Sequence, residues 1–224
     1  MTNIEHKTYT ETFGGKQLLV GVSGIIGAGK STLTSALASK LGFAEVREPV
    51  TENPYLPFFY EDMKKYGFTM QVFLLNKRFR HHQSMIWGES SAIQDRTIYE
   101  DVIFAKMLHE SGNISDLDFE TYCSLFENMT NFLHRPDVIL YLDVTPETAL
   151  TRVQARGRDC EKGLPLTYLT SLRAGYEDWL RDVGGRVPIV RLDWNNHIDN
   201  IDNLDLNDVV TKIAAASKRS MLIF

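Results

Sequence analysis

The stretch at residues 20–32, VGVSGIIGAGKST, constrains the fold of this chain more than any other. Gly24, four further residues, and then Gly29, Lys30 and Ser31 match the phosphate-binding P-loop pattern. The apolar run before the loop predicts a buried strand, and residues 31–40 have helical spacing. Inward-facing backbone N–H groups, a helix N-terminus and a lysine together favour a bound phosphate group. The loop therefore predicts nucleotide binding at Gly24, Gly27, Ala28, Gly29, Lys30, Ser31 and Thr32.

Length and composition indicate one globular domain. The chain has 224 residues, of which 43% are hydrophobic and 24% are charged, enough for an ordinary core. No apolar run approaches the roughly 20 residues of a membrane helix, so no membrane partner is expected. Residues 1–16 mix both charges without a hydrophobic or arginine-rich segment. We expect 1–16 to be a flexible tail and 17–224 to be a single domain.

The net charge and the number of cysteines limit the expected binding partners and cellular location. The net charge of -5 offers no basic face for a nucleic acid, so none is expected as a partner. Cys123 and Cys160 are too few for a disulfide framework and lack the spacing of metal ligands. A reducing cytoplasm is the expected location.

Strand-like and helix-like segments alternate along the chain. We predict strands at 18–22, 43–47, 91–94, 137–142 and 187–192. We predict helices at 31–40, 55–65, 69–87, 99–110, 116–133, 146–156, 165–181 and 206–217, with Gly67 separating the second from the third. Such alternation implies a parallel sheet covered by helices on both faces, with ligands at the carboxyl ends of the strands.

Two strand ends beside the loop carry charged residues that decide between kinds of nucleotide enzyme. Glu48 follows the second strand, and Asp95 and Arg96 close the third. A hydroxyl that accepts a phosphoryl group must lose a proton, so a nearby carboxylate favours a hydroxyl acceptor over a phosphate acceptor. Standing alone, Glu48 could equally be a solvated carboxylate, and Asp95 could cap the next helix. A switch GTPase is disfavoured because no Asn-Lys-x-Asp segment is present.

The combined pattern resembles the deoxyribonucleoside kinases, and within them the microbial deoxyadenosine and deoxyguanosine kinases. It comprises the P-loop, Glu48-Pro-Val, Tyr60, Gln71, the run from Asp95 to Asp101, and Arg152-x3-Arg156-Gly-Arg158-x2-Glu161. The resemblance covers about 18–179, with Asp-Arg-Thr in place of the more usual Asp-Arg-Ser. It implies an α/β, three-layer, P-loop NTPase-like fold with a five-stranded parallel sheet and an arginine-rich lid at about 152–163.

The resemblance also implies roles for particular residues. Glu48 would accept the proton of the 5′-hydroxyl, Arg96 would hold the same oxygen, and Lys30 would bind the phosphates of ATP. Ser31 and Asp95 would manage Mg²⁺. The remaining implied contacts are the 3′-hydroxyl with Tyr60 and Glu161, the base with Gln71, Arg78 and Asp101, and the donor phosphates with Arg152, Arg156 and Arg158.

The identity of the base is less constrained. Gln71 can pair with adenine, cytosine or guanine. The resemblance implies that charges at Arg78 and Asp101 argue against thymine, because thymidine-preferring members of the family usually carry apolar or small residues at these positions. We expect deoxyadenosine first, and deoxyguanosine or deoxycytidine as alternatives. A nucleoside-monophosphate kinase and a non-catalytic nucleotide-binding subunit are the remaining readings. By analogy with the family, we expect a homodimer.

Overall fold

The computed structural model describes residues 13, 16–48, 53–88, 90–196 and 205–220. Its strands are β1 (Leu19–Ser23), β2 (Ala44–Val46), β3 (Ala92–Asp95), β4 (Val138–Asp143) and β5 (Ile189–Asp193). Its α-helices are α2 (Lys30–Leu41), α3 (Leu56–Phe59), α4 (Met63–Ile86), α5 (Asp101–Glu110), α6 (Asp116–Thr130), α7 (Pro146–Arg156), α8 (Leu166–Val183) and α9 (Leu206–Ser220). Two 3₁₀ turns, η1 (Ile98–Glu100) and η2 (Asp159–Glu161), complete the fold.

The five strands form one parallel sheet in the order β2-β3-β1-β4-β5. β1 occupies the centre, and its five residues are all buried, as expected for a strand covered on both faces. In the register of the sheet Val22 lies beside Asp95, and Val46 lies beside Gln94. The residue that follows β1 and the residues that follow β2 therefore emerge next to the end of β3. The predicted α/β fold with a five-stranded parallel sheet is confirmed.

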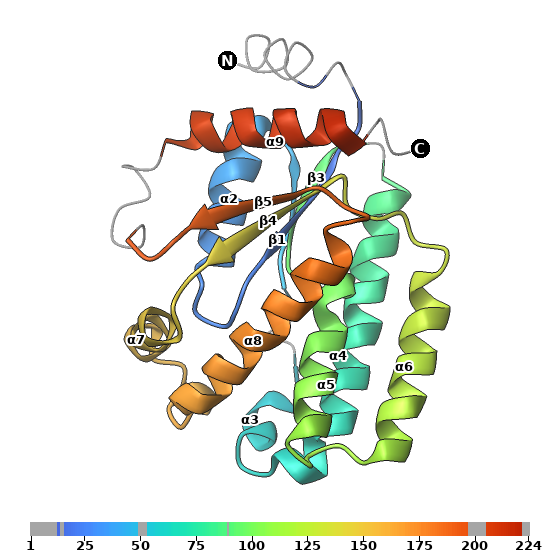
Figure 1. The fold of residues 1–224 in the computed structure, drawn as a ribbon, viewed down its shortest axis with the longest axis vertical. Helices are drawn as coiled ribbons and strands as arrows, with labels where there is room; N and C mark the ends of the chain where they lie inside the picture. The colour runs from blue at the N-terminus through green and yellow to red at the C-terminus, as the bar shows by residue number, and fades with distance from the viewer. Residues whose placement is uncertain (1–12, 14–15, 49–52, 89, 197–204, 221–224) are drawn as a thin grey trace.

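Helices cover both faces of the sheet (Figure 1). α2 and α9 lie on one side, whereas α4, α5 and α8 lie on the other, and α6 packs outside α4 and α5. The main core is formed by apolar side chains of the central strands and the helices against them, including Val20, Val22, Leu33 and Leu140. No helix in the described part of the chain is long and apolar enough to cross a membrane.

The prediction of a helix break at Gly67 is wrong. α4 runs without interruption from Met63 to Ile86, and Gly67 lies buried inside it. A Cβ atom at this position would lie 3.3 Å from the Asn113 carbonyl oxygen and 3.4 Å from the Ile114 side chain. The glycine thus permits close packing of α4 against the loop after α5, and this tertiary contact outweighs its low helix propensity.

The expected N-terminal tail falls mostly outside the described residues. Phe13 and Lys16 are described, and both contact the domain. Phe13 is buried against Phe43, with ring centroids 6.0 Å apart, and the Lys16 ammonium lies 2.6 Å from the Asp137 carboxylate. These two contacts lie within the segment 1–16 that we expect to be a flexible tail.

Candidate active site

The P-loop joins β1 to α2, and three of its glycines, Gly24, Gly27 and Gly29, have positive φ angles. Gly27 has a φ of 81°, and a Cβ atom there would lie 2.4 Å from the Ala149 carbonyl oxygen of α7, so only glycine fits. Lys30 at the start of α2 donates 3.0 Å hydrogen bonds to the carbonyl oxygens of Gly24 and Ile25. Burial lowers the pKa of Lys30 to about 8. A phosphate group would offer this lysine a stronger partner than the two carbonyl groups.

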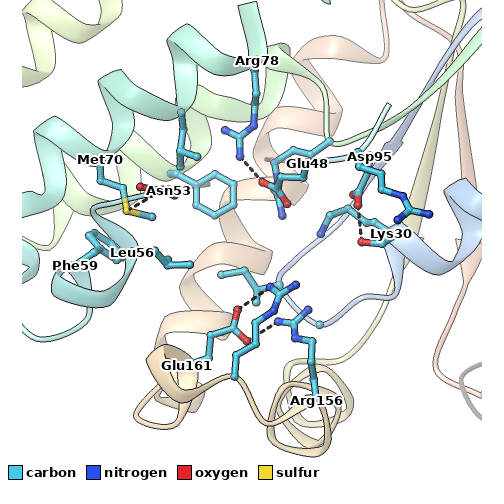
Figure 2. Close-up of a pocket in the computed structure, with 18 of the residues that line it drawn as sticks. Lys30, Glu48, Asn53, Leu56, Phe59, Met70, Arg78, Asp95, Arg156 and Glu161 are labelled. Carbon is cyan, nitrogen blue, oxygen red and sulfur yellow. Dashed lines mark hydrogen bonds and ion pairs between the residues drawn. The ribbon is translucent and has the colours of Figure 1, made fainter. Parts of the chain in front are cut away.

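A cavity of about 710 Å³ opens at the carboxyl edge of the sheet, in front of the P-loop. Figure 2 shows Lys30 and Asp95 on one side of it, Met70 and Phe59 on the other, and Glu48 between them. Residues 26, 27 and 29–32 of the P-loop line the cavity, whereas Gly24 and Ala28 do not. The cavity therefore joins the predicted phosphate site to a largely apolar compartment.

Ser31 and Asp95 meet at the P-loop end of the cavity. The Ser31 hydroxyl donates a 2.5 Å hydrogen bond to Oδ2 of Asp95, and burial raises the pKa of Asp95. Oδ1 of Asp95 is buried without a hydrogen-bond partner. A hydroxyl and a carboxylate beside a phosphate cradle are ligands that suit Mg²⁺. The described residues contain no group of three or more His, Cys, Asp or Glu placed to hold a metal ion.

Glu48 lies in the cavity between two buried arginines. Its carboxylate forms an ion pair with Nε of Arg96 at 2.9 Å and accepts a short hydrogen bond from Arg78. Burial raises the pKa of Glu48, but the two arginines outweigh burial and lower it to about 2. Glu48 is therefore ionised at neutral pH, which is the state that can accept a proton.

Arg96 has an unusual backbone conformation. Its φ is 66°, and it is the only non-glycine residue with a positive φ in the described part of the chain. Such a conformation costs on the order of 1–3 kcal/mol and persists only when surrounding contacts enforce it. The Arg96 N–H group donates to the Val22 carbonyl oxygen at 3.0 Å, and the guanidinium carbon lies 4.7 Å from the centroid of the Phe104 ring. These contacts turn the side chain back over the end of β1 toward Glu48.

The apolar compartment carries the residues predicted to contact a base. Gln71 is buried, and its Oε1 atom has no hydrogen-bond partner. Apolar side chains surround it, and they are Leu56, Phe59, Met70, Leu74 and Phe104. Three side chains that could pack against the flat face of a base, Phe59, Phe104 and Met70, line the cavity. Met85 does not, because it packs with Leu19 and Ala92 at the opposite end of the sheet.

Arg78 connects Glu48 with the compartment for the base. Its guanidinium makes short hydrogen bonds to both Asp101 and Glu48, so the predicted pair of Arg78 and Asp101 forms but is shared with Glu48. Asp101 lies behind Arg78 and does not line the cavity. Burial raises the pKa of Asp101 to about 7, against the lowering effect of Arg78.

The segment predicted as a lid brings two of its three arginines to the cavity. Arg156 and Arg158 contact opposite oxygens of the Glu161 carboxylate, at 2.6 and 3.3 Å. Arg152 is directed elsewhere, because it donates to the carbonyl oxygens of Trp194 and Asn195 at 2.7 and 2.9 Å. It reaches the P-loop only through the Ala28 carbonyl oxygen at 3.4 Å, so the structure does not place it among the cavity residues.

Several cavity residues were not anticipated from the sequence. Asn53 is buried there, and its side-chain oxygen Oδ1 accepts a hydrogen bond from the Tyr55 N–H group. Tyr168 of α8 faces the same space as Tyr60, and burial raises the pKa of both phenols. Asn53 precedes a proline and Tyr168 lies in an amphipathic helix, and neither sequence context predicts a position in a binding site. Both residues reach the cavity only because the tertiary structure brings distant segments together.

The fold and the cavity together define a P-loop protein in which an apolar compartment adjoins the loop. The deoxynucleoside kinase family model matches residues 20–217, and the chain belongs to this family. It is 49% identical over 180 residues to a deoxyadenosine kinase of Dictyostelium discoideum, covering 80% of this chain and 74% of that protein. It is 36% identical to a deoxyadenosine/deoxycytidine kinase of Bacillus subtilis, covering 89% of this chain and 93% of that protein.

A solved structure supports the same assignment. The deoxyadenosine kinase of M. mycoides with bound dATP superimposes with a TM-score of 0.76 at 31% sequence identity, covering 86% of this chain and 98% of that chain. The resemblance noted in the sequence is thereby confirmed, and so are the P-loop fold and the kinase activity. The chain is a deoxynucleoside kinase.

Proposed function

We propose that this kinase transfers the terminal phosphoryl group of ATP to the 5′-hydroxyl of deoxyadenosine. The observation that carries the proposal is the position of Glu48, which lies in one cavity with Lys30 and Arg96 and is ionised. An uncharged hydroxyl can deliver its proton to this carboxylate. A nucleoside monophosphate would instead bring a negative charge toward it, so a hydroxyl acceptor is favoured.

The reaction assigns a task to each side of the cavity. Lys30 and the loop N–H groups hold the ATP phosphates, and Arg156 and Arg158 close over them from the lid. Arg96 holds the 5′-oxygen and stabilises charge on the transferring group, while the proton passes to a carboxylate oxygen of Glu48. Ser31 and Asp95 would hold Mg²⁺ with the phosphates. When bound, the ion neutralises charge on the donor phosphates.

The acceptor compartment fits a deoxyribonucleoside. Tyr60 and Glu161 line the cavity at the lid, where they contact the 3′-hydroxyl, and the Tyr60 ring restricts the space beside the sugar. The base lies between the apolar walls, with its polar edge toward the unpartnered Gln71 amide and the Arg78 guanidinium. Deoxyadenosine kinase activity of the relatives favours adenine. Deoxyguanosine and deoxycytidine are the alternatives.

Replacing Glu48 with glutamine tests the chemistry. We expect kcat to fall at least about 100-fold, because the general base is lost, while the dissociation constant for ATP changes little. Glu45→Gln is a matched control, because Glu45 lies on β2, contacts Ser35 and Arg47, and does not line the cavity. Activity of the Glu48→Gln variant equal to that of the parent would remove Glu48 from the mechanism.

An assay with alternative acceptors tests the substrate. The four natural deoxynucleosides, adenosine and dAMP are offered in parallel with labelled ATP. We expect deoxyadenosine to have the highest kcat/KM and adenosine to be a poor acceptor. Turnover of dAMP without turnover of deoxyadenosine would identify a monophosphate kinase, and ATP binding without any transfer would identify a regulatory subunit.

The kinase is also proposed to be a cytoplasmic homodimer. The support is an exposed apolar surface on α6 and the chain after it, where Leu117 is 73% and Phe132 is 94% exposed. Long helices with uncovered apolar side chains commonly pair with a second copy. Sedimentation velocity should give the mass of a dimer, and Leu117→Lys should shift the protein toward the monomer. A monomeric parent would contradict the proposal.

A further inference from the structure

A second carboxylate, that of Glu100, lies behind Arg96 on the side away from the cavity. Glu100 belongs to η1, has no exposed surface and does not line the cavity. Its Oε2 atom lies 3.4 Å from an amino nitrogen of Arg96. The Arg96 guanidinium is therefore placed between two carboxylates, with Glu48 on the cavity side and Glu100 on the protein side.

The two oxygens of Glu100 fix both the backbone and the side chain around Arg96. Oε1 accepts hydrogen bonds from the Thr97 N–H group at 2.7 Å and from the Ser23 hydroxyl at 2.8 Å. Oε2 accepts a short hydrogen bond from the Tyr176 hydroxyl, and that hydroxyl in turn accepts one from Arg96. One side chain thus holds the peptide that follows the strained residue and also the guanidinium group that the residue presents.

Tyr176 extends this arrangement to α8. It is fully buried, and its ring contacts Phe104, which also lies under the Arg96 guanidinium. Because Tyr176 donates to Glu100 and accepts from Arg96, its hydroxyl bridges the two charged groups. Neither Tyr176 nor Glu100 can contact a nucleoside in the cavity directly.

A purely structural role would not require a charge at this position. Glu100 completes a capping box with Thr97, but the amide oxygen of a glutamine would accept the same two bonds at Oε1. A buried carboxylate is costly unless a cation compensates it, and Arg96 is the cation in contact with it. We therefore infer that the negative charge of Glu100 serves the interaction with Arg96, whereas the helix cap needs only a hydrogen-bond acceptor.

We propose that Glu100 and Tyr176 are positioning residues that keep the Arg96 guanidinium at the reacting oxygen throughout the transfer. The proposal rests on the proposed function, in which the 5′-hydroxyl proton moves to Glu48. That transfer neutralises Glu48 and removes the front partner of Arg96. Glu100 and Tyr176 take no part in that proton transfer and keep their contacts with Arg96, so Arg96 stays in place while charge develops on the transferring group.

Tyr176→Phe and Glu100→Gln test the proposal kinetically. Because displacement of a catalytic group by about 1 Å can cost 100-fold, we expect kcat to fall roughly tenfold or more in each variant. The KM values for nucleoside and ATP should change less than about twofold, since neither residue lines the cavity. Thr97→Val is the matched control, because it removes a 3.3 Å cap hydrogen bond to Glu100 without touching the guanidinium, and its kcat should stay near that of the parent.

A double variant distinguishes positioning from stability. In an Arg96→Lys background, Tyr176→Phe should reduce kcat no further, because the group being positioned is absent. Multiplicative losses in the double variant would overturn the proposal. An unchanged kcat for Tyr176→Phe together with a lower melting temperature would also overturn it. Should Glu100→Gln fail to fold, Tyr176→Phe carries the test alone, since it removes only one oxygen atom.

A readout without turnover separates this proposal from the proposed function. In protein labelled with ¹⁵N-arginine, the side-chain N–H signals of Arg96 should exchange slowly in the parent and at least tenfold faster in Tyr176→Phe. A parent that phosphorylates no nucleoside yet shows this protection would refute the function and retain the positioning pair. Equal exchange in parent and variant would refute the pair, whatever the substrate.

Discussion

The Ser31 hydroxyl donates a 2.5 Å hydrogen bond to the Asp95 carboxylate, although the two residues are 64 positions apart in the chain. Ser31 lies in the first turn of α2 and Asp95 ends β3, and the parallel pairing of β1 with β3 brings them together. The Ser31 oxygen keeps its lone pairs when it donates, and Oδ1 of Asp95 has no hydrogen-bond partner, so each residue retains an oxygen that a cation could contact.

The first prediction concerns this pair. Asp95→Asn should raise the free Mg²⁺ concentration for half-maximal activity at least about tenfold, because the carboxylate charge is lost from the site. The measurement is a titration of activity against free Mg²⁺ at constant ATP. Asp143→Asn is a suitable control, because Asp143 also ends a strand at this edge, yet it pairs with Arg173 and Arg191 outside the cavity. An unchanged Mg²⁺ midpoint in Asp95→Asn would contradict the assignment.

Glu161 should discriminate between sugars with and without a 3′-hydroxyl. A hydrogen bond to a buried carboxylate contributes about 1.5–3 kcal/mol, so Glu161→Gln should lower kcat/KM for deoxyadenosine about 10- to 100-fold. The variant should act on 2′,3′-dideoxyadenosine nearly as well as the parent does. Comparing the two substrates cancels any effect of releasing Arg156 and Arg158. Asp159→Asn, in the same segment but exposed, should leave the substrate ratio unchanged. Equal losses for both nucleosides would remove Glu161 from sugar recognition.

His82 should make the folded state sensitive to acid. His82 is fully buried, with Nε2 2.6 Å from the His134 carbonyl oxygen. Burial lowers the pKa of His82, so below pH 6.5 the unfolded chain binds a proton that the folded chain does not.

The free energy of unfolding should therefore decrease as the pH falls below about 6.5, by up to about 1.4 kcal/mol for each pH unit until the folded pKa is reached. Urea unfolding at pH 7.5, 6.5 and 5.5 measures this slope. His82→Gln should flatten it, whereas His109→Gln, which alters a partly exposed histidine beside Asp116, should not. A slope that is identical in the parent and in His82→Gln would exclude His82 as its source.

Gly21 of β1 should tolerate no side chain. A Cβ atom there would lie 2.3 Å from the Thr97 methyl group, on the residue that follows Arg96. We expect Gly21→Ala to destabilise the fold by about 1–3 kcal/mol and to lower kcat as well, because Thr97 must move. Thr97→Ser removes the clashing methyl group, so the double variant should regain most of both losses.

The control for this prediction is Gly185→Ala, since a Cβ atom there meets nothing within 4 Å. Thermal unfolding and initial rates at saturating substrate give the two quantities. A Gly21→Ala variant with the stability of Gly185→Ala would show that β1 can shift to accept the methyl group.

Much of the site follows from sequence because its parts are local or lie at strand ends. The P-loop is a continuous motif, and the rule for parallel sheets places Glu48 and Asp95 beside it without any knowledge of packing. The direction of a helical side chain is different, because it depends on neighbours from distant segments. Arg152 turns toward the chain after β5, and His82 turns into the protein, although both lie on helices that the sequence predicts.

The sequence pattern also did not predict close contacts between helices and loops, or side chains that share a hydrogen-bond partner. Gly67 reads as a helix break by propensity, yet it serves a contact with the loop after α5. Glu100 reads as one more charge in a helical segment, and its bonds to Arg96 and Tyr176 depend on α8, which lies about 75 residues further along the chain. Ion pairs of this kind arise from the assembled tertiary structure.

Part of the continuous helix α4 lines the cavity at residues that could select the nucleoside, away from the residues proposed for catalysis. Arg78 of α4 contacts Glu48, but the turns of α4 at Met70, Gln71 and Leu74 line the apolar part of the cavity. The P-loop and the end of β3 contribute Lys30 and Asp95. Changes along those turns can alter which nucleoside fits without disturbing the catalytic residues. A lineage with this scaffold can thus diversify its substrates one helical position at a time while its chemistry stays constant.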